Sequence, residues 1–456
     1  MLMADRAHLL LLLHAHLPYV RRPDLPAALE EDWLFEAITE TYIPLLDMFE
    51  RLGRDGVAFR VALSISPTLC EMLRDPLLIG RYRAHMKRSI DLAEDEAKRH
   101  RRSEEMAPVT RMYRDWFNEA DRIFNDRYEG DLLSIFCRLA AEGSVELITT
   151  AATHAYLPLT SRDSGAARAQ VKIAVQYFKK IFGSTPAGFW LPECGYSPGL
   201  ENILAENGIK YFFLDAHGLL NAKPPSPRGT IAPIATENGL AVFGRDLESS
   251  RLIWHPESGY PGAAVYRDFY RDQGYELEME QLKDYLAPYG HRKMTGLKYH
   301  KITGGGQEKD IYDPEAARAQ AVAHAEHFYH SRLDQAQAEG APDDSAPPIF
   351  VAPFDAELFG HWWFEGPIFL EALIRKAAQQ KDGLKLITPS EYLGRHRPAH
   401  TASPAASSWG LGGHSQMWLD PSNDWIYRHL HRAEDKMTGM ARLYGGATGA
   451  LKRALD

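Results

Sequence analysis

Short apolar runs that each end in a polar residue constrain the fold of this chain more than any other feature. Leu9–Leu13 is followed by His14 and His16, and Ile349–Phe354 is followed by Asp355. Uninterrupted apolar runs are typical of parallel strands buried on both faces, and the polar residue then lies at the carboxyl edge of the sheet. Helix-like segments separate the runs, so the pattern predicts an α/β fold, a parallel barrel whose active site lies at that edge.

The same pattern recurs along the chain. Strands are expected at 8–13, 57–63, 145–150, 188–191, 210–215, 240–243, 349–354 and 384–388. The polar residues expected at or just beyond strand ends are His14, His16, His154, Glu193, Asp215 and Asp355. Stability alone does not account for this coincidence, so these six side chains are the first candidates for a functional site.

The segments between the strands predict helices and insertions. Helices are expected at 28–51, 164–183, 314–338 and beyond 424, with a charged helical insertion at about 70–142 and an irregular insertion at about 256–312. Residues 222–237 are expected to form a proline-rich loop and residues 340–348 a flexible connector. We therefore expect a barrel over 1–395 and a C-terminal helical segment over 396–456.

Composition limits the partners of the chain. The net charge is −9 and the sequence pI is about 6.1, which argues against a nucleic-acid surface and fits an uncharged polymer. Leu9–Leu13 is too short to span a membrane. Only three cysteines occur, far apart, so no disulfide framework is expected and a cytoplasmic location is predicted.

Glu193 is the first candidate for chemistry. It follows Pro192 at the end of an apolar run and stands between Trp190 and Tyr196. Aromatic faces beside a carboxylate suit sugar rings, which offer C–H faces for stacking and hydroxyls for hydrogen bonds. The alternative is that Glu193 caps the N-terminus of the next helix.

Asp355 repeats this design. It ends the run Ile349–Phe354, which contains a proline, and is followed by Glu357 and His361. Trp362 and Trp363 come next, so this carboxylate also lies among aromatic residues.

His14 and His16 fall on one face of their strand because side chains alternate. A His-x-His pair is common in zinc sites, and the same pair could bind substrate hydroxyls instead. The third alternative is two histidines that only pack in the core.

Five short motifs together resemble those of glycoside hydrolase family 57. They are His14-Ala-His16-Leu-Pro, Ala152-Thr-His154-Ala-Tyr-Leu-Pro, Trp190-Leu-Pro-Glu193-Cys-Gly-Tyr, Pro353-Phe-Asp355-Ala-Glu-Leu-Phe-Gly-His361-Trp-Trp and Ser408-Trp409-Gly-x-Gly-Gly-His414. Cys194 and the extension His-Trp-Trp-Phe-Glu-Gly-Pro are most similar to the 1,4-α-glucan branching enzymes of that family.

The resemblance implies an incomplete (β/α)7 catalytic barrel with a helical insertion, and a helical C-terminal domain, here 396–456, that contributes to the active-site cleft. It also implies Glu193 as nucleophile, Asp355 as general acid/base, an α-1,4-glucan such as amylose or a glycogen-like polymer as substrate, and no metal or cofactor. The candidates for substrate binding are His14, His16, His154, Trp190, Asp215, His361, Trp362, Trp409, Trp418, Trp33 and Trp254. Retaining chemistry needs one ionised and one protonated carboxyl group, and branching replaces water with a glucan 6-hydroxyl as the acceptor.

Two features depart from the pattern of the branching enzymes. Their mobile loop usually carries a tyrosine, whereas the corresponding residues 222–237 contain none, and Arg228 and Ile231 flank the glycine where an aromatic would be sought. The C-terminal helical segment is also short. The sequence therefore predicts a larger hydrolytic share than is usual for a branching enzyme.

Three other functions compete with branching. A hydrolytic, α-amylase-like relative would use the same two carboxylates. A metal-dependent deacetylase would use His14 and His16 as ligands, but it leaves Glu193 and Asp355 without a role. A non-catalytic glucan-binding protein does not require both carboxylates.

Overall fold

The computed structural model describes residues 7–160, 165–255, 258–304, 308–339, 346–380, 383–446 and 448. The chain forms two compact units. The first comprises Met1–Leu63, Thr68–Glu146 and Leu247–Thr388, and the second comprises Ser64–Pro67, Leu147–Asp246 and Pro389–Asp456. Strand β2 (Val61–Ile65) is divided between them.

A parallel sheet lies at the centre of the first unit. Strand β1 (Ala7–Ala15) pairs in parallel with β8 (Ile349–Asp355) and with β9 (Leu384–Leu386). All nine residues of β1 are buried, as expected for a continuous apolar run. The β1–β8 register places His14 directly opposite Asp355, so two of the predicted strand-end residues are neighbours.

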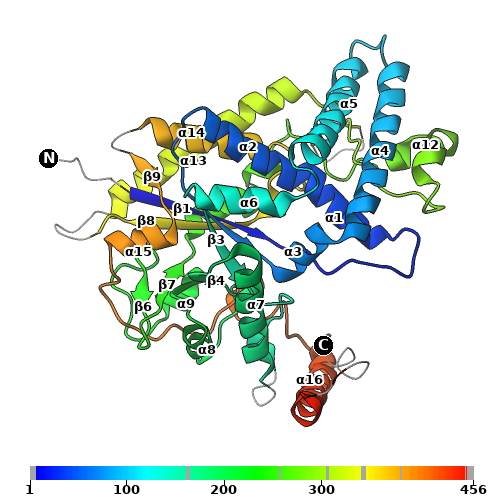
Figure 1. Ribbon diagram of the computed structural model, residues 1–456. Helices are drawn as coiled ribbons and strands as arrows, with labels where there is room; N and C mark the ends of the chain where they lie inside the picture. Colours follow the sequence, from blue (N-terminus) through cyan, green and yellow to red (C-terminus); the bar gives the residue numbers. More distant parts are fainter. Residues whose placement is uncertain are drawn as a thin grey trace. The chain divides into compact units, whose positions relative to one another are not determined.

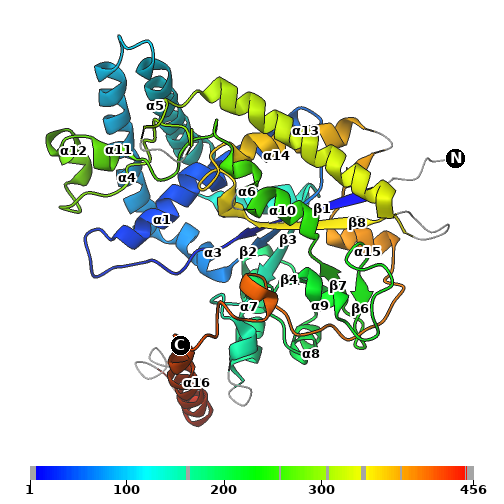
Figure 2. The ribbon, with the colours of Figure 1, turned by 180° about the vertical axis from the view of Figure 1, so that it is seen from behind.

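Helices make up most of the first unit (Figures 1 and 2). They are α1 (Leu29–Ala37), α2 (Ile43–Arg54), α3 (Pro67–Arg74), α4 (Pro76–Arg99), α5 (Met106–Arg122), α6 (Leu132–Ala141), α10 (Leu247–Trp254), α11 (Gln273–Glu276), α12 (Met279–Leu286), α13 (Pro314–Glu339) and α14 (Gly366–Gln379). Short turns of 3-10 or π helix are η1 (Ile38–Tyr42), η2 (Ile123–Arg127), η5 (Tyr260–Gly262) and η6 (Ala356–Leu358). The predicted helices at 28–51 and 314–338 are confirmed, and a π-helical turn interrupts the first of them at η1.

The charged insertion predicted at 70–142 is helical. Its two longest helices, α4 and α5, lie side by side as an antiparallel pair in both views (Figures 1 and 2). Asp75 caps α4 by accepting hydrogen bonds from the backbone N–H groups of Leu77 and Leu78, with Pro76 at the first helical position.

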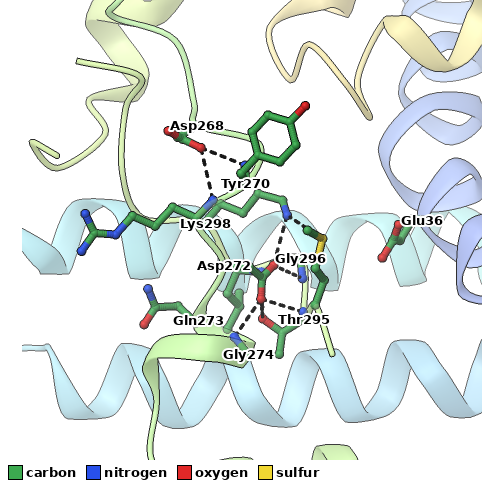
Figure 3. A network of polar contacts seen from close by, with 12 residues as sticks. Glu36, Asp268, Tyr270, Asp272, Gln273, Gly274, Thr295, Gly296 and Lys298 are labelled. Carbon is green, nitrogen blue, oxygen red and sulfur yellow. Dashed lines mark hydrogen bonds and ion pairs between the residues drawn. The ribbon is translucent and has the colours of Figure 1, made fainter. Parts of the chain in front are cut away.

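Buried Asp272 orders the irregular insertion at 256–312 (Figure 3). It accepts hydrogen bonds from the backbone N–H groups of Gly274, Thr295 and Gly296 at 2.8, 2.8 and 3.0 Å. The Thr295 hydroxyl donates to it at 2.9 Å, and Lys298 Nζ lies 3.1 Å away. A carboxylate with this many donors fixes a segment that has few regular elements.

Within the second unit, the strands follow the order β3–β4–β5–β7–β6. These strands are β3 (Val145–Thr150), β4 (Gly188–Trp190), β5 (Tyr211–Leu214), β7 (Ala241–Gly244) and β6 (Ile234–Ala235). The first four run parallel, but β6 pairs antiparallel with β7, so the expectation of a purely parallel sheet is wrong at this edge. Five residues, 236–240, join β6 to β7, which is too few for the crossover that a parallel pair requires.

Helices and a buried apolar cluster complete the second unit. The helices are α7 (Ala166–Phe182), α8 (Leu200–Glu206), α9 (Ala216–Leu220), α15 (Pro389–Arg395) and α16 (Asp424–Tyr444), with short turns η3 (Leu157–Leu159), η4 (Pro192–Cys194) and η7 (Leu411–Gly413). The cluster includes Val171 of α7, Phe189 of β4, Phe212 of β5 and Val242 of β7. These residues anchor the strand ends that carry the candidate site.

Several predicted boundaries need correction. The strand expected at 57–63 is β2, which starts at Val61, because residues 57–60 still belong to the loop after α2. Of the connector expected at 340–348, residues 340–345 lie outside the described residues. By contacts, Pro389–Asp456 groups with Leu147–Asp246 in the second unit, and the division expected at residue 395 stays a prediction. In the described part of the chain, no helix has the length and apolar character needed to cross a membrane.

The proline-rich loop at 222–237 is held by the segment 400–403. Lys223 and Ser403 exchange backbone hydrogen bonds of 2.9 Å in both directions. Ala235 N donates to His400 O at 2.8 Å, and Ala402 N donates to Ala235 O at 2.9 Å. Both ends of the loop are therefore tied to neighbouring backbone.

Candidate active site

Glu193 follows β4 in a strained turn of the second unit. Its φ of 60° lies in the left-handed region, which is uncommon for a residue with a Cβ, and Cys194 has a φ of 51°. Backbone hydrogen bonds from Cys194 N to Leu191 O and from Gly195 N to Pro192 O, both 2.9 Å, close the turn. Such strain persists where the surroundings fix the residue, and it is concentrated at functional sites.

Trp409 fixes the Glu193 carboxylate. The indole Nε1–H donates a hydrogen bond to Glu193 Oε2 at 2.6 Å, and the backbone N–H of Trp409 donates to Glu193 O at 2.8 Å. His154 Nδ1 lies 3.8 Å from Glu193 Oε1. Burial raises the pKa of Glu193, and the hydrogen bond from Trp409 works in the opposite direction.

Trp190 supports this arrangement from the core. It is fully buried at 0% exposure, and its ring centroid lies 5.2 Å from that of Trp409. The expectation that Trp190 offers a flat face to a sugar ring is therefore wrong, because its faces are covered by protein.

Two further predicted residues lie close to this turn. Trp418 is half-buried and stacks on Tyr156, with ring centroids 5.2 Å apart and planes 23° apart. The Tyr156 hydroxyl lies 2.6 Å from Ser415 Oγ. His154 adopts a φ of 55°, so this strand end is strained in the same way as Glu193.

Asp215 was expected to bind substrate, but its carboxylate contacts other side chains of the protein. Its residue exposure is 7%; Oδ1 lies 3.1 Å from His217 Nδ1, and Oδ2 lies 3.1 Å from Arg245 Nη1. Burial works to raise the pKa of Asp215, but the hydrogen bond from His217 and the charge of Arg245 outweigh burial and lower it. Both oxygens of this carboxylate are already engaged by the protein.

Asp355 is the last residue of β8 in the first unit, as predicted. Its register neighbour His14 is 2% exposed, and the rings of His14 and His16 are stacked with centroids 5.9 Å apart. Burial lowers the pKa of His16 to about 4, so its imidazole is neutral at ordinary pH.

Glu357 is a buried carboxyl group that was not among the predicted site residues. It accepts hydrogen bonds from the Tyr42 hydroxyl and, at 3.1 Å, from the backbone N–H of His16. Burial raises the pKa of Glu357 to about 8. A carboxyl group two residues beyond Asp355 was visible in the sequence, but Tyr42 lies in the distant turn η1 and could not be paired with it.

His361 is fixed by an acidic cluster on α1 and η1. Its Nδ1 lies 2.6 Å from Glu40 Oε2 and 3.9 Å from Glu36 Oε2. Burial and the neighbouring charge of Glu40 raise the pKa of Glu36 to about 7. Gly360 has a φ of 116°, and a Cβ there would lie 1.8 Å from the Glu40 carbonyl oxygen, so only glycine permits this contact.

Four other tryptophans of the first unit differ in exposure. Trp362 is 52% exposed and stacks on Phe269 with ring centroids 4.4 Å apart, whereas Trp363 is 1% exposed. Trp33 and Trp254 are 52% and 40% exposed. Trp362, Trp33 and Trp254 therefore present ring surface that a sugar could contact.

Within the described ranges, no group of three or more His, Cys, Asp or Glu side chains is placed to hold a metal ion. The two predicted catalytic carboxylates have separate surroundings, Glu193 in the second unit and Asp355 in the first.

Comparison with known proteins identifies the family. The sequence profile of glycosyl hydrolase family 57 matches residues 10–404. The chain is 32% identical to a 1,4-alpha-glucan branching enzyme of Thermococcus kodakarensis, over 99% of this chain and 67% of that protein.

Solved structures show the same fold. The α-amylase AmyC of Thermotoga maritima is 41% identical with a TM-score of 0.89, over 97% of this chain and 83% of that chain. A family-57-type branching enzyme of Pyrococcus horikoshii is 32% identical with a TM-score of 0.86. The match covers 99% of this chain and 82% of that chain. The expected α/β fold, an open barrel-like sheet with many helices, is confirmed by this likeness. The chain therefore belongs to glycosyl hydrolase family 57 and is an enzyme that acts on α-glucans.

Proposed function

We propose that this enzyme is a 1,4-α-glucan branching enzyme in which Glu193 is the nucleophile and Asp355 the general acid/base. The observation that carries the proposal is the Glu193 carboxylate, which a strained turn and the indole of Trp409 hold in one orientation. The identity of 32% to the Thermococcus kodakarensis branching enzyme, over 99% of this chain, supports the choice of branching.

In the first half-reaction the Glu193 carboxylate attacks the anomeric carbon of an α-1,4-linked glucose unit. The glycosidic bond breaks, and its oxygen takes the proton of Asp355. In the second half-reaction a glucan 6-hydroxyl gives its proton to the Asp355 carboxylate and attacks the same carbon, which releases Glu193. Two inversions give an α-1,6 bond, so the anomeric configuration is retained.

The substrate contacts are part of the proposal. Among the predicted residues, Trp409 and Trp418 are proposed to stack on glucose rings beside Glu193, and Trp362, Trp33 and Trp254 to do so in the first unit. His14, His16, His154 and His361 are proposed to bind glucan hydroxyls. Asp215 and Trp190 are not included, because both are occupied by protein contacts.

Hydrolysis is the second candidate function, and a specific observation favours it. The identity of 41% to the α-amylase AmyC is higher than that to either branching enzyme compared above. The loop 222–237 contains no aromatic residue that could contact an acceptor chain. Because water competes for the glycosylated Glu193 unless the acceptor is held and water is excluded, we expect a measurable hydrolytic share.

Product analysis decides between the two. Purified enzyme is incubated with amylose, and new α-1,6 linkages and new reducing ends are both counted by proton NMR. Branching predicts α-1,6 linkages that increase with time, together with a smaller number of reducing ends. The Glu193→Gln variant is the control and should give neither product. New reducing ends without α-1,6 linkages would instead establish a hydrolase.

A further inference from the structure

The imidazole of His217, on the short helix α9, lies between two hydrogen-bond acceptors. Its Nδ1 lies 3.1 Å from Asp215 Oδ1, and its Nε2 contacts the carbonyl oxygen of Gly413. An ionised carboxylate and a backbone carbonyl can only accept hydrogen bonds. A neutral imidazole carries one N–H and can satisfy only one of them, whereas the imidazolium cation donates to both.

The other side chains around His217 fit a cation. Among the described residues, Asp215 is the only anion in contact with His217, and Arg245 contacts the opposite oxygen of Asp215 at 3.1 Å. The ring of His414 packs edge-on against His217 with centroids 5.1 Å apart. The hydrogen bond to Asp215 raises the pKa of His217 and burial opposes that shift, while the Gly413 carbonyl adds to it.

The second acceptor belongs to the turn that carries Trp409. Gly413 O also accepts a hydrogen bond of 2.9 Å from the backbone N–H of Ser408, which closes the turn around Trp409. Gly413 has a φ of 70°, and a Cβ there would lie 2.4 Å from His217 Cε1. Only glycine therefore allows the histidine ring to reach this carbonyl.

A second contact runs from Asp215 to the same indole. The Arg245 guanidinium, held by Asp215 Oδ2, lies 5.5 Å from the ring centroid of Trp409. A guanidinium at this distance attracts the face of an indole ring. Asp215 thus acts on Trp409 in two ways, through His217 on its backbone turn and through Arg245 on its ring.

We propose that His217 is a positioning residue which, as the imidazolium, clamps the Gly413 turn to Asp215 and so holds the Trp409 indole against the Glu193 carboxylate. This inference rests on the proposed role of Glu193 as nucleophile. When pH rises through the pKa of His217, the ring loses one of its two donors. The clamp opens, and Trp409 no longer orients Glu193.

At alkaline pH, kcat could also fall because Asp355 loses the proton that it donates. The test therefore uses a substrate whose leaving group needs no proton. Departure of fluoride from α-maltosyl fluoride does not need the proton of Asp355, so deprotonation of Asp355 no longer limits the first step. We expect kcat of the wild type to fall at alkaline pH on this substrate. In Asp215→Asn the fall should begin at lower pH, because the carboxylate that favours the imidazolium is gone. In His217→Gln kcat should be lower and the alkaline fall absent.

Glu276→Gln is the matched control, because it neutralises a carboxylate 3.5 Å from another histidine, His300, in the first unit. Its profile should coincide with that of the wild type. A purely structural role for His217 would lower kcat in the variants without moving the pH at which it falls. An alkaline fall at the same pH in the wild type and in Asp215→Asn would overturn the proposal.

A second measurement does not depend on activity. In protein with carbon-13-labelled histidine rings, the signal absent from His217→Gln identifies His217. Its titration should lie above the usual histidine pKa of about 6.5 and move to lower pH in Asp215→Asn. A titration at or below the usual value would contradict the clamp. If Glu193→Gln retained turnover while His217 titrated as expected, the nucleophile assignment would fail and the charged contact would stand.

Discussion

At the scale of single residues, the site is built on backbone conformations that side chains rarely adopt. Glu193 and His154 both have positive φ values although each has a Cβ. Each such residue costs about 1–3 kcal/mol and persists only where its neighbours fix it. For Glu193 these neighbours are the two hydrogen bonds from Trp409 and the closed turn at Pro192. These contacts offset the conformational cost and hold the carboxylate in one orientation.

Replacement of Trp409 by phenylalanine tests this contact. The ring remains, but the N–H donor that opposes the effect of burial on Glu193 is lost, so the pKa of Glu193 rises further. The nucleophile must be ionised, so the acidic limb of the kcat/KM profile should move to higher pH. A hydrogen bond to a charged group is worth about 1.5–3 kcal/mol, so kcat/KM should fall roughly 10- to 100-fold.

Trp425→Phe is the control for this variant, because it removes an indole hydrogen bond to the Ser422 carbonyl at an exposed position. Its pH profile should match that of the wild type. An unchanged acidic limb in Trp409→Phe would mean that the indole does not influence the ionisation of Glu193.

The sequence allowed Glu193 and Asp355 to be placed at strand ends, because an apolar run followed by a polar residue is a local pattern. It did not reveal the partners of Asp215. His217 and Arg245 are 2 and 30 residues away in sequence, and nothing local shows that both reach one carboxylate. The burial of Trp190 was missed for the same reason, since Trp409 and Phe213 cover it from other elements.

At the scale of elements, most strands and long helices were predictable from apolar periodicity. Short irregular elements were not. The π-helical turn η1, which carries Glu40 and Tyr42, interrupts a segment that reads as one helix. The two-residue strand β6 lies in a loop whose prolines gave no strand signal. Both depend on contacts with distant segments, which sequence periodicity does not record.

Ile231 shows why the effect of a tyrosine in the loop 222–237 could not be predicted from the sequence. Because it lies near Gly229, position 231 is where a tyrosine that contacts the acceptor chain would be introduced. The Ile231 side chain is buried, however, at 8% exposure. A larger, polar ring at this position would crowd the core, at a cost of about 1–3 kcal/mol. Ile231→Tyr should therefore lower the melting temperature without raising the ratio of α-1,6 bonds to reducing ends.

Pro227→Tyr is the matched comparison, because Pro227 is an exposed residue of the same loop. It should leave the melting temperature closer to that of the wild type. A stable Ile231→Tyr variant with an increased branching ratio would show that the side chain at 231 turns outward toward the acceptor.

At the scale of the whole molecule, the two proposed catalytic residues belong to different units of one chain. Glu193 is fixed within the second unit by residues 154 and 409, and Asp355 within the first by β1 and η6. The family and the α/β class were predictable because five short motifs occur in order. The division into units was not, since residues 389–456 pack with a segment that precedes them by more than 140 positions.

The central claim is that Glu193 forms a covalent bond to the sugar. A 5-fluoro α-glucosyl fluoride tests it most directly, because the good leaving group permits the first step while the ring fluorine slows release of the intermediate. If Glu193 is the nucleophile, the intact mass rises by one fluoroglucosyl group, and the labelled peptide carries that group on Glu193. Asp355→Asn should be labelled too, because departure of fluoride needs no proton donor. A label on Asp355, or active enzyme that turns the reagent over with inverted configuration, would contradict the account.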